Sequence, residues 1–243
     1  GHRPAFNHGL YRMKPEIPLL FTQNWNTYQK VVRSNYMLHE EFSALTFKYL
    51  ELQSRVFPLA MLDLGCGDGG ILSKGLGSLG VDSYTGYDLS GIALGLCREH
   101  LEPLGFPLRL IEGKMEDLLL KEQNKFTLVY SSFAIHHLQD EGKAELIRSV
   151  YEHLVPGGRF LFIDVYRKPG ATLEEYYNSY LSNVDRNWKS LEAEEKNRIE
   201  DHIRNYDFPA FREQLEAWCV GAGFAVEDKP DLDHWHQLMV LKK

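Results

Sequence analysis

The chain has 243 residues, of which 44% are hydrophobic and 25% charged, a composition typical of globular proteins. Its net charge is −7 and Lys and Arg form no run, so we expect a small-molecule partner and no nucleic acid. No apolar stretch is long enough to span a bilayer, and three cysteines without CxxC spacing indicate a reduced, cytoplasmic protein with no membrane partner.

The predicted elements begin with an N-terminal helical extension over residues 1–57, because apolar residues from Val31 to Leu50 recur at helical spacing. In the second unit, residues 58–243, strands alternate with helices. The expected strands are 59–64, 83–88, 108–112, 126–131 and 159–165. This alternation is typical of a parallel sheet covered by helices on both faces. Ser90 is the expected N-cap of the helix after the second strand.

The alternation ends after Val165. Residues 166–206 are polar and aromatic and predict two helices, which we expect to fold over the ligand site as a lid. A helix over 209–220 follows. The last two strands, 224–227 and 237–241, are joined without a helix and should therefore pair antiparallel.

The most informative motif is the sequence MLDLGCGDGG at residues 61–70. Glycines carry no Cβ, so a ligand can approach the backbone, and the turn should open a helix whose free N–H groups face the ligand. Gly65, Gly67 and Gly70 satisfy GxGxxG, and Asp88 follows about 20 residues later, where an acid binds ribose hydroxyls. This pattern predicts an adenosine cofactor, and it fits NAD and S-adenosylmethionine equally.

Four features favour S-adenosylmethionine. Asp63 stands in an apolar strand end, where a carboxylate needs a partner. A cationic methionine group would supply one, whereas a pyrophosphate would be repelled. The Pro-Gly-Gly turn at 156–158, the antiparallel strands at the C-terminus and the helices before the first strand point the same way.

In these motifs the chain resembles the class I S-adenosylmethionine-dependent methyltransferases, over roughly residues 57–243. LDLGCGDG at 62–69 looks like the family's cofactor loop, YDLS at 87–90 like its ribose motif, and EGKMEDL at 112–118 like its adenine-flanking segment. SSFAIHHL at 131–138 is similar to the segment after strand four in many small-molecule methyltransferases. The resemblance implies an α/β, Rossmann-like fold with a seven-stranded, mostly parallel sheet and an antiparallel last strand.

The resemblance also implies the cofactor site. Many relatives carry an acid where this chain has Lys114, which moves the expected adenine contacts to Met115 and Glu116. In similar enzymes an aromatic side chain from the N-terminal helices closes over the methionine end, and Tyr36 is our candidate; alternatively it continues an apolar helix face. The expected cofactor-binding residues are Tyr36, Asp63, Gly65, Cys66, Gly67, Asp88, Leu89, Met115, Glu116 and Ser131.

Methyl transfer is an in-line displacement with an activated leaving group, so the protein mainly aligns and desolvates the nucleophile. His136 follows strand four, and an imidazole with a pKa near ~6.5 suits a general base; a structural role is the alternative. The candidate substrate contacts are His137, Tyr166, Tyr177, Tyr180, His234 and Trp235. We expect no metal, because metal-dependent relatives place an acid where Ser131 and Ser132 stand, and a site within residues 231–236 is less favoured than a polar rim.

The expected function is therefore methyl transfer from S-adenosylmethionine to an O, N or C nucleophile of a small molecule. One alternative is an enzyme of the carboxy-S-adenosylmethionine synthase type, to which the lid and the residues after it bear a loose similarity. Others are an NAD-dependent oxidoreductase and a binding module that has lost catalysis. Neither the methyl acceptor nor the oligomeric state follows from the sequence.

Overall fold

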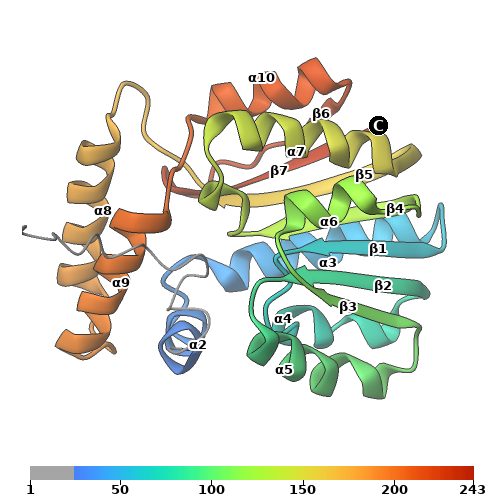
Figure 1. Cartoon of the computed structure of the whole chain (residues 1–243), viewed down its shortest axis with the longest axis horizontal. Coiled ribbons are helices and arrows are strands. Elements are labelled where there is room, and N and C mark those ends of the chain that lie inside the picture. The colour runs from blue at the N-terminus through green and yellow to red at the C-terminus, as the bar shows by residue number, and fades with distance from the viewer. Residues whose placement is uncertain (1–24) are drawn as a thin grey trace, which may run out of the picture.

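The computed structural model describes residues 25–243, and a seven-stranded sheet lies at its centre (Figure 1). The strand order is β3-β2-β1-β4-β5-β7-β6. The strands are β1 (Leu59–Leu64), β2 (Val81–Asp88), β3 (Leu108–Glu112), β4 (Phe126–Ser132), β5 (Leu154–Val165), β6 (Ala225–Asp228) and β7 (His236–Lys242). Strands β1 to β5 run parallel, and β7 is antiparallel to both of its neighbours. The predicted α/β fold with an antiparallel last strand is confirmed.

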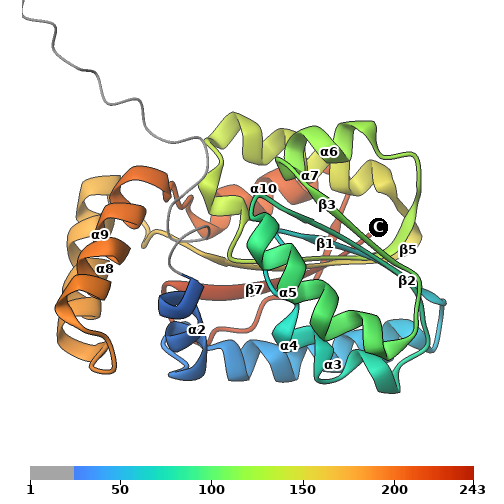
Figure 2. The same cartoon turned by 60° about the horizontal axis from the view of Figure 1, so that its bottom comes forward.

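Helices cover both faces of the sheet, which is why its inner strands are apolar at nearly every position (Figure 2). On one face lie α6 (Met115–Lys121), α7 (Asp140–His153) and α10 (Arg212–Ala222), which pack on Leu62, Val129 and Phe160. On the other face lie α3 (His39–Ser54), α4 (Gly70–Ser73) and α5 (Gly91–Leu101), which pack on Met61 and Leu128. Two apolar layers thus hold the sheet and fix the ends of its strands.

Two elements differ from the sequence prediction. The helix that opens after the glycine loop is a single turn, α4, followed by a short 3-10 turn at Leu76–Ser78, because glycines at 75, 77 and 80 lower the helix propensity. Strand β5 begins at Leu154 rather than at Arg159. The backbone around Gly157 and Gly158 exchanges hydrogen bonds with Lys243, so the predicted turn is part of the paired strand.

Residues 166–206, which the sequence predicts as a lid of two helices, contain α8 (Leu173–Asn187) and α9 (Ala193–Tyr206), and we call these the lid helices. They pack beside α2 (Trp25–Arg33) in a separate apolar cluster that includes Val31, Tyr180 and Trp188 (Figure 1). Helices α2 and α3 are the described part of the N-terminal extension; residues 1–24 lie outside the described residues. Between Trp25 and Lys243, no helix is long and apolar enough to cross a membrane.

Asp207, just after α9, ends the lid against the carboxyl end of β4. Thr172 opens α8 with a capping box, in which its hydroxyl accepts from the Glu175 N–H and the Glu175 carboxylate accepts from the Thr172 N–H. Beyond α9, the Phe208 N–H donates to the His136 carbonyl at 2.8 Å. The lid therefore begins and ends on the edge of the sheet at which β4 and β5 finish.

Candidate functional site

The glycine loop after β1 passes close to two other segments. Gly65, Gly67 and Gly69 adopt φ angles of 72°, 56° and 64°, which favour glycine over every other residue. A Cβ on Gly65 would lie 2.5 Å from the Ala134 Cβ. The N–H groups of Gly65 and Cys66 both donate to the Tyr87 carbonyl, at 2.8 and 2.9 Å. The loop is thereby held between β2 and the segment after β4, and its remaining backbone lines a cavity.

Asp63 is a buried carboxylate at the wall of this cavity, with a side chain from β1 that is only 2% exposed. The Tyr84 hydroxyl donates to its Oδ2, and its Oδ1 has no hydrogen-bond partner among the described residues. Burial raises the pKa of Asp63 to about 7, even though the bond from Tyr84 lowers it. A buried carboxylate oxygen without a partner fits a ligand that brings a positive charge or an N–H donor.

Asp88 connects the end of β2 to the glycine loop. Its carboxylate accepts from the Gly67 and Ser90 N–H groups, both at 2.9 Å. Burial raises the pKa of Asp88 and these two hydrogen bonds lower it again, with a net rise. Each carboxylate oxygen keeps a lone pair for a further donor, as recognition of the ribose hydroxyls requires. Ser90 caps α5 as predicted, since its hydroxyl accepts from the Ala93 N–H at 3.1 Å.

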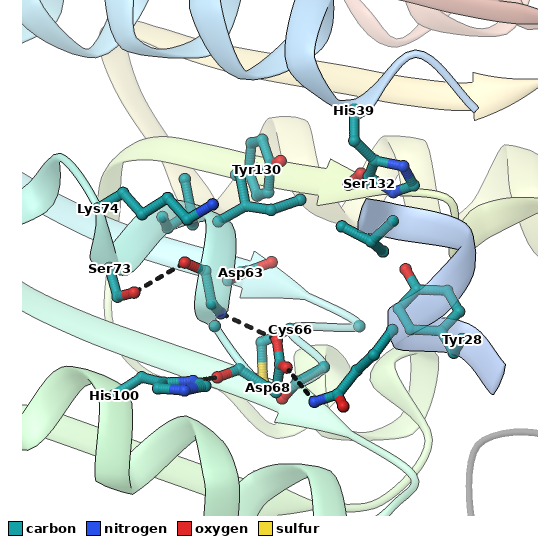
Figure 3. A pocket seen from close by; sticks show the side chains of 18 of the residues that line it. Tyr28, His39, Asp63, Cys66, Asp68, Ser73, Lys74, His100, Tyr130 and Ser132 are labelled. Atoms are coloured by element: carbon teal, nitrogen blue, oxygen red, sulfur yellow. Dashed lines mark hydrogen bonds between the residues drawn. The ribbon is translucent and has the colours of Figure 1, made fainter. Parts of the chain in front are cut away.

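Three adjoining cavities lead from the glycine loop to the lid. The first is lined by the loop and Asp63 (Figure 3). The second is lined by Asp88, Leu89, Met115 and Glu116, and it shares Tyr28, Gly65, Gly67 and Ser132 with the first. The third lies under the lid and shares Tyr28, Phe133 and His137 with the second. Tyr28 borders all three, so one ligand in the first two cavities would reach the third.

Figure 3 shows Tyr28, His39 and Ser132 at one end of the first cavity and Ser73, Lys74 and His100 at the other. His39 is buried, and neither of its ring nitrogens has a hydrogen-bond partner in the described structure. Burial, helped by the charge of His236, lowers the pKa of His39 to about 4, so this imidazole is neutral. It packs on the ring of Phe133, a residue with a φ angle of 54°. The backbone of Phe133 is therefore strained, and its ring borders the second and third cavities.

His136 lies beneath the third cavity between two carboxylates. Its Nδ1 is 2.5 Å from Asp164 Oδ1, and its Nε2 is 3.3 Å from Asp207 Oδ1. Burial alone would lower the pKa of His136, but the carboxylates of Asp207 and Asp164 outweigh it and raise the pKa to about 10. Burial and the neighbouring His136 lower the pKa of His137 to about 4. Two adjacent imidazoles are thus held in opposite charge states.

Most of the predicted cofactor residues line the first two cavities. These are Asp63, Gly65, Cys66, Gly67, Asp88, Leu89, Met115 and Glu116. Ser131 is buried behind the wall, where its hydroxyl donates to the Leu64 carbonyl, and its neighbour Ser132 lines the cavity instead. The structure places Tyr36 away from both cavities: its ring stacks on Trp188 at 5.0 Å and its hydroxyl binds Ser190. Tyr28, another aromatic residue of the N-terminal helices, borders both cavities instead.

The predicted substrate residues separate into two groups. His137 and Tyr180 line the third cavity. Tyr166, Tyr177, His234 and Trp235 do not: Tyr166 lies in the core, Tyr177 donates its hydroxyl to the Asp207 carbonyl, and the other two pack behind Tyr180. In residues 231–236, both ring nitrogens of His236 are engaged, one with Asp233 at 3.0 Å and one with the Tyr180 hydroxyl at 2.8 Å.

Sequence reasoning missed several residues of the site: His39, Phe133, His202 and Asp207, and it passed over Tyr28 in favour of Tyr36. The helical spacing of α2 was a usable signal, because Trp25 and Tyr28 lie one turn apart and both border the second cavity. No local signal marks His202 and Asp207, which are more than sixty residues from His136 in the chain.

Comparison with known proteins identifies relatives. Residues 61–158 match a family described as "Methyltransferase domain". A ubiquinone biosynthesis O-methyltransferase of Azotobacter vinelandii is 27% identical over 79% of this chain and 75% of its own length. Another, of Nitrosospira multiformis, is 29% identical over 56% of this chain, and the match spans little more than half of that relative's length, 55%.

Solved structures show the same fold. The magnesium protoporphyrin IX methyltransferase of Synechocystis with bound SAH has a TM-score of 0.66 at 12% identity, with 93% of this chain and 96% of that chain covered. An O-methyltransferase family protein from Burkholderia thailandensis has a TM-score of 0.60 at 15% identity, with 95% of this chain and 65% of that chain covered.

Proposed function

The chain belongs to the class I S-adenosylmethionine-dependent methyltransferases, and on this premise we propose that it methylates an oxygen atom of a small aromatic molecule held under the lid. The observation that carries the proposal is the continuity of the cavities. A wall that fits the cofactor's methionine and ribose adjoins an aromatic chamber through Tyr28 and Phe133.

The cofactor of the family, S-adenosyl-L-methionine, fits the first two cavities. The unpartnered Oδ1 of Asp63 is suited to its cationic methionine end, and the lone pairs of Asp88 are suited to its ribose hydroxyls. Met115 and Glu116 border the space left for adenine. A pyrophosphate beside Asp63 would be repelled, which argues against NAD at the same place. When bound, the cofactor supplies an electrophilic methyl group on a sulfonium.

The third cavity supports an aromatic acceptor. Its walls are Val31, Met37, Phe133, Tyr176, Tyr180, Trp188 and other apolar groups from the lid and α2. The polar groups gather at one side, where His136, His137, His202 and Asp207 lie. This cavity is only about 60 Å³ in the closed arrangement, so the lid must open to admit an aromatic ring, which would then bury its faces against the apolar walls and present a hydroxyl to the polar side. The curated relatives are named O-methyltransferases, which supports oxygen as the acceptor.

The chain's own residues would act by orientation and exclusion of water. The lid helices and α2 close over the chamber, where Tyr36 stacks on Trp188 and Lys30 pairs with Glu195 at 2.8 Å. A desolvated acceptor and a fixed approach direction supply most of what an in-line displacement needs. Because its pKa is raised to about 10, His136 holds a proton at neutral pH. We therefore propose that His136 positions Asp164 and Asp207, rather than acting as the general base expected from the sequence.

Product analysis tests this proposal. The full chain is incubated with S-adenosylmethionine and a set of phenols, catechols, aromatic amines and aliphatic alcohols, and the products are identified by mass spectrometry. We expect O-methylated aromatic products. The test variant is Tyr180→Leu, which keeps an apolar wall without the aromatic ring. It should raise the KM of the acceptor, and the KM of the cofactor serves as the internal control because it should change less. Methylation confined to amines, carbon atoms or aliphatic alcohols would refute the proposed acceptor class.

A further inference from the structure

Four side chains converge where the end of the lid meets the turn after β4. His136 and His137 come from that turn, His202 from α9, and Asp207 from the residue after α9. Asp207 Oδ1 lies 3.3 Å from His136 Nε2, 3.4 Å from His137 Nε2 and 3.3 Å from His202 Nε2. The Nε2 atoms of His137 and His202 are themselves 3.3 Å apart. One carboxylate oxygen is thus surrounded by three imidazole nitrogens.

These separations are those of metal ligands. Ligand atoms about 2.0–2.1 Å from a tetrahedral zinc ion lie roughly 3.3–3.4 Å from one another. The triangle of His137 Nε2, His202 Nε2 and Asp207 Oδ1, with sides of 3.3, 3.3 and 3.4 Å, has the size of one face of such a tetrahedron. His136 Nε2 approaches the same carboxylate oxygen from its own side, and His136, His137 and Asp207 offer atoms within 4.8 Å of one another.

The carboxylate supplies a second, independent observation. The Asp207 side chain is only 8% exposed, and its Oδ1 makes no hydrogen bond within residues 25–243 despite the three nearby nitrogens. The three imidazole nitrogens are therefore close enough to Asp207 Oδ1 for ion pairs, but they do not have the geometry of hydrogen bonds to it. The three imidazoles compensate the charge of this buried oxygen without well-directed hydrogen bonds to it, and a cation among the four atoms would supply a directed bond.

The surrounding contacts are those that orient metal ligands. His136 Nδ1 lies 2.5 Å from the buried carboxylate of Asp164, a pairing that fixes the ring and leaves Nε2 for a metal. Asp164 also accepts from the Val165 N–H at 2.9 Å, so it is itself held in place. The Tyr177 hydroxyl donates to the Asp207 carbonyl at 2.7 Å and fixes the backbone of that ligand. Each ligand from the turn and from the lid end thus has support of its own.

We propose that His136, His137, His202 and Asp207 bind one divalent transition-metal ion of the zinc class. Three imidazoles and one carboxylate are a donor set that suits zinc, iron, cobalt or nickel better than magnesium or calcium. The ion would tie α9 and the lid end to the turn after β4, so it would hold the lid closed. All four residues line the third cavity, and an ion there would lower the pKa of a hydroxyl bound to it.

This proposal departs from the expectation of no metal drawn from the sequence. That expectation concerned an acid directly after β4 and the segment 231–236. In the structure the acid comes from the end of the lid, at Asp207. The ring nitrogens of His236 are paired with Asp233 and Tyr180 and are not part of this cluster. In the metal-free chain a proton on His136 neutralises Asp164 and Asp207, and the ion would displace that proton from Nε2 on binding. The competing arrangement is that the proton stays and no metal binds. The two arrangements differ in metal content and in visible absorption.

The first test is metal binding by the full chain. The protein is dialysed against a chelator, and Co²⁺ and then Zn²⁺ are titrated while bound metal and visible absorption are recorded. We expect one equivalent of Co²⁺, with absorption bands of a four- or five-coordinate nitrogen and oxygen centre that Zn²⁺ abolishes. Less than a tenth of an equivalent bound, or Co²⁺ bands of a fully hydrated ion, would overturn the proposal and leave the proton on His136.

Variants locate the site. His202→Asn and Asp207→Asn should each weaken Co²⁺ binding by at least a hundredfold, and Asp164→Asn by about 10–100-fold, as for other partners of metal-bound histidines. The control is His234→Asn, an imidazole outside the cluster, which should bind Co²⁺ as the parent chain does. Equal binding by the Asp207→Asn and parent chains would overturn the assignment.

Cofactor binding is measured in the same samples. Retained binding of S-adenosylhomocysteine shows that a variant is folded and that the loss of metal is local. Should a variant lose both, the titration of the parent chain alone decides the proposal. Metal binding without methyl transfer would uphold this site and refute the proposed function, and the reverse outcome would do the opposite.

Discussion

The Asp63 carboxylate should increase the affinity for the cofactor and lower the free energy of unfolding of the cofactor-free chain. Its side chain is buried at the cavity wall, where Oδ1 has no hydrogen-bond partner within residues 25–243, and burial raises its pKa from the ordinary value of 3.8 to about 7. Asp63→Asn preserves the shape and keeps an acceptor for the Tyr84 hydroxyl, but removes the charge. We expect the variant to be more stable than the parent chain and to bind S-adenosylmethionine more weakly.

The magnitude follows from the pKa. A difference between 3.8 and about 7 is roughly 3, which at about 1.4 kcal/mol for each pKa unit gives an upper value of about 4 kcal/mol. Because the folded chain holds this proton more tightly than the unfolded chain, its stability is lost as pH rises from about 4 to about 7. The amide side chain of the Asp63→Asn variant does not ionise, so the variant does not lose stability in this pH range. The stability difference should therefore be near zero at pH 4 and reach a few kcal/mol at pH 8.

Urea denaturation of the cofactor-free chains between pH 4 and pH 8 measures the stability difference, and isothermal titration at pH 6 and pH 8 measures cofactor affinity. Removal of one charged hydrogen-bonding partner should weaken binding roughly 10–100-fold at pH 8. The affinity of the parent chain should fall below pH 7, while that of the variant changes less. Asp82→Asn, at an exposed position on the neighbouring strand, is the control. A variant that is less stable than the parent at pH 8, or that binds the cofactor equally well, would refute the reasoning.

Three further substitutions test the loop, the ribose site and the lid. Gly65→Ala adds a Cβ 2.5 Å from that of Ala134 at a φ of 72°, which should cost at least about 1–3 kcal/mol in urea denaturation; an unchanged midpoint would contradict the close approach. Asp88→Ala should weaken S-adenosylmethionine and adenosine alike, by roughly 10–100-fold in titration calorimetry, and a loss confined to S-adenosylmethionine would argue against the ribose assignment. Trp188→Ala removes the stack on Tyr36 and should expose α8 and α9 to faster hydrogen exchange while β1 and β4 stay protected; exchange that is unchanged in the lid would contradict its closed packing.

Elements with a local cause were predictable from the sequence. The strands up to β4 follow from short apolar runs bounded by turns, and the loop at residues 65–69 follows from glycines that the structure shows at positive φ. Ser90 is an N-cap because its hydroxyl accepts from the Ala93 N–H three residues later. The predicted start of β5 was wrong, because pairing with the distant Lys243 draws Gly157 and Gly158 into the strand.

The site under the lid depends on contacts that no local pattern encodes. Tyr36 and Tyr28 both lie near α2, and only the packing of the lid decides that Tyr36 stacks on Trp188 while Tyr28 borders the cavities. His136 was identified by its place after β4, yet its carboxylate partners lie 28 and 71 residues further along the chain, as the residue numbers of Asp164 and Asp207 show. A side chain's chemistry is set by such partners, and they become known only with the fold.

Transfer of a labelled methyl group to an aromatic hydroxyl can be measured directly. The full chain is incubated with S-adenosylmethionine that carries a trideuterated methyl group and with aromatic hydroxyl compounds, and the products are analysed by mass spectrometry. We expect a deuterated methyl ether, together with one equivalent of S-adenosylhomocysteine for each product formed. Binding of S-adenosylmethionine without any labelled product across aromatic hydroxyl acceptors, or label found only on carbon or nitrogen, would contradict the proposed function.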